Sequence, residues 1–163
     1  MTTRFLEGNN VVSQFLAVDM SVAANPGVWV SLAQFAKVVF VLQKAAGAVG
    51  EPPIFTLTQA TDNAGTGAKA LNIDTIFAKN GALASTAQFT KITQVAGPTY
   101  TPAAGNVQGV IAVEVRAEEL DVTNGFGWVR LSIPKVGITA QLGSAFAVML
   151  NPKYAVEPSV SAQ

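Results

Sequence analysis

The 163-residue sequence contains no cysteine and no histidine. Zinc and iron–sulfur sites therefore lack their usual ligands, and His-based triads and cysteine nucleophiles are excluded. Because no disulfide can form, the hydrophobic core has to hold the fold together unaided. These absences argue against a hydrolase, and we expect no catalytic residue, no metal site and no cofactor.

Charged residues are also scarce. They make up 12% of the chain, against about a quarter in ordinary soluble domains. Ten basic residues balance ten acidic ones, and a net charge near zero argues against binding to nucleic acid, which requires a basic face. The uncharged surface tolerates close contact with other protein, because few ions have to be desolvated.

Long hydrophobic runs are missing as well. Runs such as VVFVLQ at residues 38–43 are far shorter than the roughly 18 residues of a membrane-spanning helix. The first residues, MTTRFLEGNN, contain no apolar segment typical of a secretory signal peptide. We therefore expect neither a membrane partner nor a signal peptide.

What the sequence does contain is a series of short segments with the period of β-strands. In residues 54–60 (IFTLTQA), large apolar residues alternate with threonines. Residues 37–43 are apolar on both faces, which indicates a buried strand. Further strands are expected at residues 28–30, 70–78, 87–95, 110–116, 128–133 and 144–150, with a helical turn at 117–121. Turns rich in Gly, Pro and Asn separate them, so the sequence predicts an all-β, single-domain antiparallel β-sandwich, jelly-roll-like, with extended terminal arms.

The two ends of the chain lack this periodicity. We expect an N-terminal arm at residues 1–27, with one short strand near 15–18, a sandwich domain at 28–150 and a C-terminal tail at 151–163. Because the arms have no regular face of their own, their apolar residues are expected to contact a partner. The predicted partner-binding residues are Phe5, Leu6, Phe15, Leu16 and Tyr154, together with Trp128, which points away from the buried side of its strand.

The stretch QATDNAGTGAKAL at residues 59–71 places Gly65, Gly67 and Lys69 close together. A phosphate-binding loop needs adjacent Gly and Lys, a Ser or Thr after the lysine, and a helix behind the loop. Here Ala68 separates Gly67 from Lys69, and the residues that follow have strand period. The pattern favours a hairpin loop whose glycines adopt positive φ.

Carboxylates cluster in the segment VEVRAEELDV, which contains Glu114, Glu118, Glu119 and Asp121. Paired carboxylates serve glycosidases and bind calcium. However, Glu114 lies on the exposed side of a strand, and the other three share one turn beside Arg116. The cluster favours a solvated turn with local ion pairs, and a surface calcium ion is the main alternative.

Several short motifs follow one another in a recognisable order between residues 37 and 154. The most particular are Gln59-Ala60-Thr61, Lys69-Ala70-Leu71, Glu119-Leu120-Asp121-Val122 followed by Gly125-Phe126, and Pro152-Lys153-Tyr154. In these motifs the chain resembles small virion proteins of tailed bacteriophages that look like capsid decoration, or cement, proteins. These motifs are structural and not catalytic, so the resemblance implies no active-site residues in this chain. They imply a recurrent loop at residues 59–71, in which Lys69 caps a turn or pairs with a nearby carboxylate.

This resemblance implies a structural virion protein. We expect a decoration protein that binds the major capsid protein on the outer capsid surface, stabilises the head and self-associates as a homo-oligomer. One alternative is a carbohydrate- or host-surface-binding β-sandwich with Trp29, Trp128 or Tyr100 as a stacking platform. Another is a minor tail or collar component.

Overall fold

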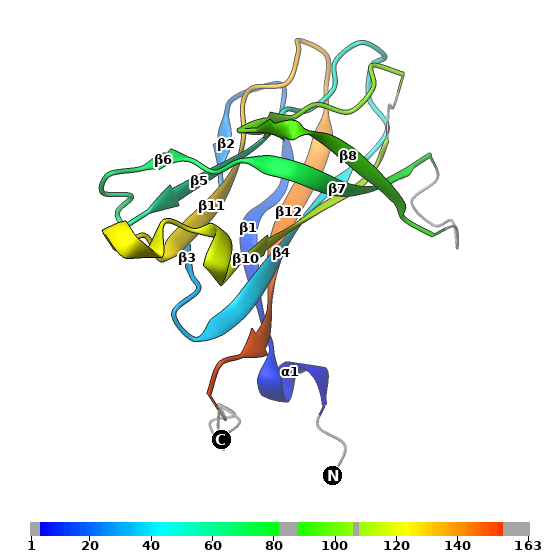
Figure 1. The fold of residues 1–163 in the computed structure, drawn as a ribbon. Helices are drawn as coiled ribbons and strands as arrows, with labels where there is room; N and C mark the ends of the chain where they lie inside the picture. Colours follow the sequence, from blue (N-terminus) through cyan, green and yellow to red (C-terminus); the bar gives the residue numbers. More distant parts are fainter. Residues whose placement is uncertain (1–3, 82–87, 106–107, 155–163) are drawn as a thin grey trace, which may run out of the picture.

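β-Strands are the predominant secondary structure of the protein, and they form two antiparallel sheets (Figure 1). The computed structural model describes residues 4–81, 88–105 and 108–154. Sheet A contains, in spatial order, β1 (Asn10–Asp19), β12 (Leu142–Pro152), β4 (Phe35–Lys44), β10 (Gly109–Arg116), β7 (Ile73–Asn80) and β8 (Thr90–Gly97). Sheet B contains β2 (Asn25–Pro26), β11 (Trp128–Ile133), β5 (Phe55–Ala60) and β6 (Lys69–Ala70), with β3 (Val30–Ser31) beside β11 and β9 (Thr99–Tyr100) beside β5. The predicted all-β antiparallel sandwich is confirmed, and its jelly-roll form stays a prediction.

Helical structure in the described residues is limited to short pieces. They are the α-helix α1 (Phe5–Gly8) and the 3-10 turns η1 (Ala117–Glu119) and η2 (Val122–Asn124). The helical turn expected at residues 117–121 thus occurs as η1. No helix in the described residues is both long enough and apolar enough to span a membrane.

The core lies between the inner faces of the two sheets. On β4, Val38, Phe40 and Leu42 point inward and are fully buried. Sheet B supplies the opposite side of the core through Phe55, Leu57, Val129, Leu131 and Ile133, all fully buried. The alternation that predicted β5 and β11 therefore also predicted which of their residues form the core.

The outward residues of β4 differ from expectation. The sequence predicts a strand buried on both sides, yet Val39 and Val41 are partly exposed. They lie on the side of sheet A that faces away from sheet B, and the described residues form no third layer over that side. The prediction of burial on both faces is therefore wrong, because an apolar run does not specify what packs against each face of its strand.

The N-terminal strand is longer than predicted. The sequence indicates only a short strand near residues 15–18, whereas β1 has 10 residues and pairs with β12 from Asn10 to Asp19. Register shifts between Ser13 and Phe15, and between Phe15 and Val18, interrupt the pairing. These irregularities break the two-residue period, which explains why the sequence shows no clean alternation here. Phe15 and Val18 pack against the core, so this part of the predicted arm is an edge strand of the sandwich.

The predicted strand at residues 70–78 is split in two. β6 pairs with β5 in sheet B, whereas β7 pairs with β10 and β8 in sheet A. The chain passes from one sheet to the other at Leu71 and Asn72, which lie between the two strands. The alternation continues across this crossing, so the sequence gives no sign of it.

Candidate functional site

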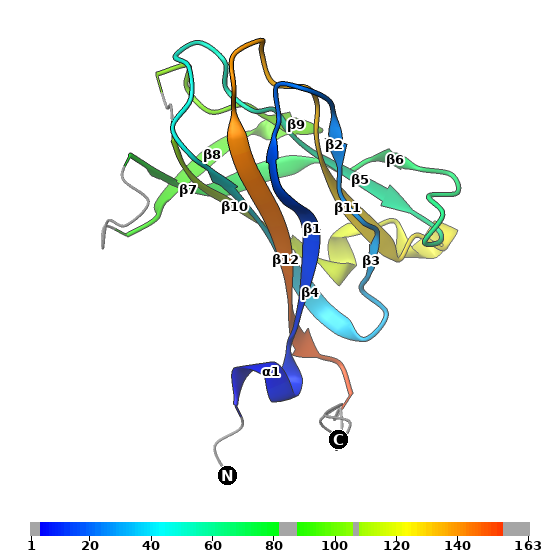
Figure 2. The same ribbon diagram turned by 180° about the vertical axis from the view of Figure 1, so that it is seen from behind.

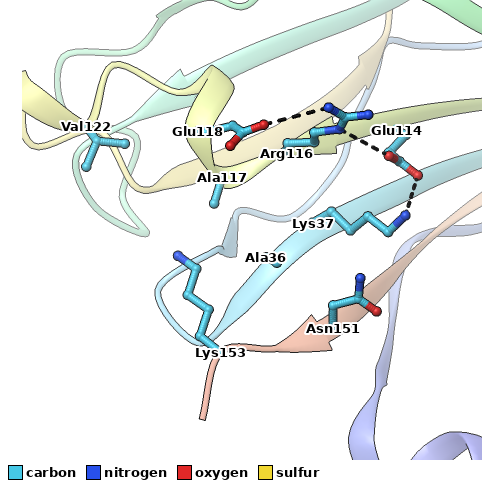
Figure 3. Close-up of a pocket in the computed structure, with 9 residues that line it drawn as sticks. All are labelled: Ala36, Lys37, Glu114, Arg116, Ala117, Glu118, Val122, Asn151 and Lys153. Carbon is cyan, nitrogen blue, oxygen red and sulfur yellow. Dashed lines mark hydrogen bonds and ion pairs between the residues drawn. The ribbon is translucent and has the colours of Figure 1, made fainter.

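A groove of about 550 Å³ lies where β4 begins and where β10 and β12 end (Figure 3). Its lining residues are Ala36, Lys37, Glu114, Arg116, Ala117, Glu118, Val122, Asn151 and Lys153. Both ends of the described chain emerge on this side of the molecule (Figure 1). We call this side the terminal end.

The groove carries a ladder of ion pairs. Lys37 Nζ lies 2.9 Å from Glu114 Oε2, and Arg116 Nε lies 3.5 Å from Glu114 Oε1. Arg116 Nη1 in turn lies 3.7 Å from Glu118 Oε1. Glu114 and Arg116 are two residues apart on β10 and share its outward side, and Lys37 is directly opposite Arg116 on β4. These charges compensate one another at a partly exposed site, so each pair adds little stability.

This geometry confirms the predicted turn with local ion pairs for Glu114 and Glu118. Within the described residues, no group of three or more Asp or Glu side chains is placed to hold a metal ion. The groove presents cations and carboxylates side by side, an arrangement that suits a protein surface carrying both signs of charge better than a free anion.

Asn151, near the end of β12, and Lys153, just after it, form one wall of the groove. The Lys153 backbone N–H donates to the Gln34 carbonyl at 2.8 Å, and Lys153 Nζ donates to the Leu32 carbonyl at 2.9 Å. Asn151 adopts a φ of 56°, a left-handed conformation that Asn tolerates better than most residues. These bonds fix the point at which the C-terminal segment leaves the sandwich.

Large apolar side chains are exposed at the same end. Phe5 is 55% exposed, Leu6 is 69% exposed and Tyr154 is 70% exposed. Phe5 and Leu6 belong to α1, whose first turn is closed by the Arg4 backbone N–H donating to Glu7 Oε2 at 2.7 Å. Tyr154 directly follows the groove residue Lys153. Three of the predicted partner-binding residues thus lie at the terminal end.

The other three predicted residues lie elsewhere. Phe15 packs partly against the core from β1, while its neighbour Leu16 is 76% exposed. Trp128 is half-buried on the outer side of β11, opposite Ser31 of β3. The structure therefore does not join all six residues into one surface.

A second groove, of about 380 Å³, brings both tryptophans of the chain together. Trp29, Trp128 and Phe35 line it, together with the polar residues Asn10, Ser31 and Gln34. The Arg130 guanidinium stacks 4.4 Å from the Trp29 ring centroid. Sequence reasoning treated the two tryptophans separately, because only the pairing of β3 with β11 brings them close. Tyr100 is buried, at 7% exposure, so the idea that it forms a stacking platform was wrong.

The glycine-rich segment forms the loop between β5 and β6. Gly65 and Gly67 have φ angles of 85° and 64°, which confirms the predicted positive-φ turn. Asp62 Oδ1 accepts the backbone N–H groups of Ala64 at 3.0 Å and Thr66 at 2.9 Å. Hydrogen bonds from Thr66, its side chain foremost, lower the pKa of Asp62. The loop therefore already binds its own carboxylate where a phosphate-binding loop would bind its ligand.

The Lys69 side chain also has partners within the protein. Its ammonium forms an ion pair with Asp121 and stacks 4.1 Å from the Phe126 ring centroid. The hydrogen bond from Lys69, followed by one from the Asn124 side chain, lowers the pKa of Asp121. The prediction that Lys69 pairs with a nearby carboxylate is confirmed. The loop, η2 and their joining ion pair form a structural unit.

No protein-family model and no curated protein matches the sequence. Among solved structures, that of the SPBc2 prophage-derived protein YomS aligns with 88% of this chain and 93% of its own, at 8% sequence identity and a TM-score of 0.49. A similarity of this size supports no conclusion about family or function.

Proposed function

We propose that the protein is a structural component of a tailed-phage virion, a decoration protein that binds the outside of the capsid without catalysing a reaction. The observation that carries the proposal is the terminal end, where Phe5, Leu6 and Tyr154 expose large apolar side chains beside a charge-balanced groove. The resemblance of the strand motifs to phage decoration proteins agrees with such a role.

The terminal end has the features of an attachment surface. Exposed Phe and Tyr side chains on short terminal segments can insert between capsid subunits, where their burial offsets the loss of chain entropy. The ladder of Lys37, Glu114 and Arg116 would then orient the protein, because a partner with the opposite order of charges fits in one direction only. Many copies, each contributing modest free energy, would stabilise the capsid.

The experiment measures binding to capsids that lack decoration. Leu6→Ser and Tyr154→Ser should each reduce the number of bound copies per capsid, and the double variant should reduce it further. Ile138→Ser is the matched control, because Ile138 is 90% exposed but lies in the loop between β11 and β12, at the opposite end of the molecule (Figure 1). Wild-type protein that leaves capsids bare would refute the decoration role. Binding that survives the double variant would refute the terminal end as its attachment site.

The aromatic groove favours one second candidate, a carbohydrate-binding role. Its lining combines two indole rings with the Asn10 and Gln34 amides and carries no charged side chain, a composition that suits a neutral sugar. Because Trp29 and Trp128 are the two tryptophans of the chain, intrinsic fluorescence reports on this groove directly. Titration with neutral oligosaccharides such as chitotriose and maltotriose should shift the emission if sugars bind, and an unchanged spectrum at millimolar sugar would count against this role.

A further inference from the structure

The outer face of sheet A has the wrong polarity for a surface exposed to water. In antiparallel sheets with one face on the core, the other face is usually polar. Sheet B follows this rule, since Thr56, Thr58, Arg130 and Ser132 lie on its outer face. On sheet A apolar residues occupy many of the corresponding positions, while Lys37, Gln43, Lys79, Glu114, Arg116 and Ser144 occupy others. The apolar residues are Val11, Phe77, Val39, Val41, Val110, Phe146, Val148 and Leu150. We call this set the apolar face.

The pairing register shows that the apolar face is continuous. Residues directly opposite each other in an antiparallel pair point to the same side. One row runs from Val11 on β1 through Val148 on β12 to Val39 on β4. The next row runs from Phe146 through Val41 and Ala112 to Phe77. The face thus crosses β1, β12, β4, β10 and β7, which lie side by side in Figure 2.

The side chains of this face are accessible to solvent. Val11 and Phe77, at its two borders, are 46% and 37% exposed. The central residues Val39, Val41 and Val148 are partly exposed. Their inward neighbours Val38, Phe40 and Ala147 are fully buried. The face is therefore the uncovered side of a sheet whose other side forms the core.

Its size points to a protein partner. Two rows about 7 Å apart that span three and four strands about 4.8 Å apart, with Val110 and Leu150 beside them, give an apolar area on the order of 300 Å². Single exposed apolar residues are common, whereas a contiguous patch of a few hundred Å² is often functional. A stable interface buries about 800 Å² on each partner. The apolar face can therefore form the centre of such an interface, with polar neighbours such as Ser144 and Gln43 as its rim.

We infer that the apolar face binds the same face of a second copy of this chain, which makes the protein a two-fold symmetric dimer. Rows of Val with Phe are the composition of the inner face of a β-sandwich, and interfaces of permanent homodimers resemble a domain core cut in half. Two sheets with the same twist pack face to face at a small angle. The apolar face of a second copy has the same twist and the same polarity.

The charges around the face also fit a second copy. The ionised side chains next to the apolar residues lie at the borders of the face: Glu114, opposite Val39, pairs with Lys37 at 2.9 Å, and Lys79 and Lys91 lie opposite Val110 and Phe77. A second copy of a chain with ten basic and ten acidic residues brings no excess charge to the interface. The inference does not depend on the proposed virion role, because it concerns the purified protein.

The first test is the mass of the protein in solution. Sedimentation velocity of the wild type at micromolar concentrations should give twice the monomer mass of 16.9 kDa. Val41→Lys places an unpaired charge at the centre of the interface and should weaken dimerisation by at least ~100-fold. Ile138→Lys, at a 90% exposed position outside the face, is the matched control and should stay dimeric. Far-UV circular dichroism of each variant checks that the sandwich is intact.

The second test uses the absence of native cysteine. Across a two-fold axis, a residue near the centre meets its own counterpart. Val148→Cys should therefore give covalent dimers with a short bis-maleimide, while Val95→Cys, at a 93% exposed position on β8, should give few.

A wild type that stays monomeric at hundreds of micromolar would overturn the inference. So would a dimer that persists in Val41→Lys and does not cross-link through Val148→Cys. Monomers that still bind capsids would leave the virion role standing and refute only the dimer.

Discussion

At the scale of single residues, the loops are held by short-range contacts that only particular side chains permit. Gly65 combines a φ of 85° with a close approach to Trp29, since a Cβ at this position would lie 2.9 Å from Trp29 Nε1. Any other residue would meet both a backbone penalty and a steric clash. The glycine therefore serves the packing of the loop on sheet B, and not the binding of a phosphate.

Gly65→Ala should accordingly destabilise the protein more than Gly50→Ala. Gly50 also has a positive φ, of 86°, but a Cβ there would meet no atom within 4 Å. Gly50→Ala should therefore cost only the backbone strain, about 1 kcal/mol, and Gly65→Ala roughly 1–3 kcal/mol more because of the contact with Trp29. Urea unfolding of the two variants measures the difference. Equal losses of stability would mean that Trp29 moves aside at no cost.

The Glu51 carboxylate, at the end of the sandwich opposite the terminal end, makes the free energy of unfolding depend on pH. Glu51 accepts the backbone N–H groups of Ile138 at 3.0 Å and Thr139 at 3.1 Å, and the Gln141 side-chain amide at 3.0 Å. These bonds, the one from Ile138 foremost, lower the pKa of Glu51 in the folded protein. Its ionised form thus stabilises the fold above the unfolded pKa of about 4.3, and this contribution is lost as the pH falls through the lower folded value.

The Glu51→Gln variant should therefore show a flatter dependence of stability on pH. Below about pH 4 the wild type loses the contribution of ionised Glu51, whereas glutamine has no proton to gain. The free energy of unfolding, measured in urea between pH 7 and pH 2, should fall less steeply in the variant. Parallel curves for the two proteins would show that Glu51 does not contribute to acid unfolding.

At the scale of elements, β1 shows how one strand can serve both the core and the surface. Phe15 packs against the core, while the next residue, Leu16, is 76% exposed. The register shifts on either side of Phe15 turn its side chain inward within an irregular edge strand. Of these two predicted partner-binding residues, Phe15 is therefore part of the core packing and Leu16 is open to solvent.

Alanine substitutions on β1 should separate these two roles. Phe15→Ala should cost about 2 kcal/mol, somewhat less than a fully buried phenylalanine, whereas Leu16→Ala should change stability by less than about 0.5 kcal/mol. The free energy of unfolding in urea measures both. A large loss for Leu16→Ala would mean that its side chain is covered, and no loss for Phe15→Ala would mean that β1 is detached from the core.

At the scale of the whole molecule, the two sheets share one core and should unfold together. Both tryptophans lie on or beside β3 and β11 of sheet B, so their fluorescence reports on that sheet, whereas far-UV circular dichroism reports on both. The two signals should give coincident urea transitions with the same midpoint. A fluorescence transition that precedes the dichroism transition would show that sheet B unfolds separately.

The sequence by itself determined the positions of most strands, the inward residues of β5 and β11, and the local chemistry of the loops. Alternation in β5 and β11 marked Leu57 and Leu131 as core, and the broken glycine–lysine spacing around Gly67 marked a turn. These features depend on residues close together in the chain, where the period of a strand and the freedom of glycine act directly.

Only the tertiary structure decided which strands are neighbours, and so which side chains share a surface. Pairing of β3 with β11 brings Trp29 and Trp128 into one groove, and pairing of β1, β12, β4, β10 and β7 joins separate valines into the apolar face. The apolar pattern of β4 is the same whether Val39 meets a third layer, a second copy or water. Burial depends on what packs against a strand, and that partner is specified by residues distant in the chain or by another molecule.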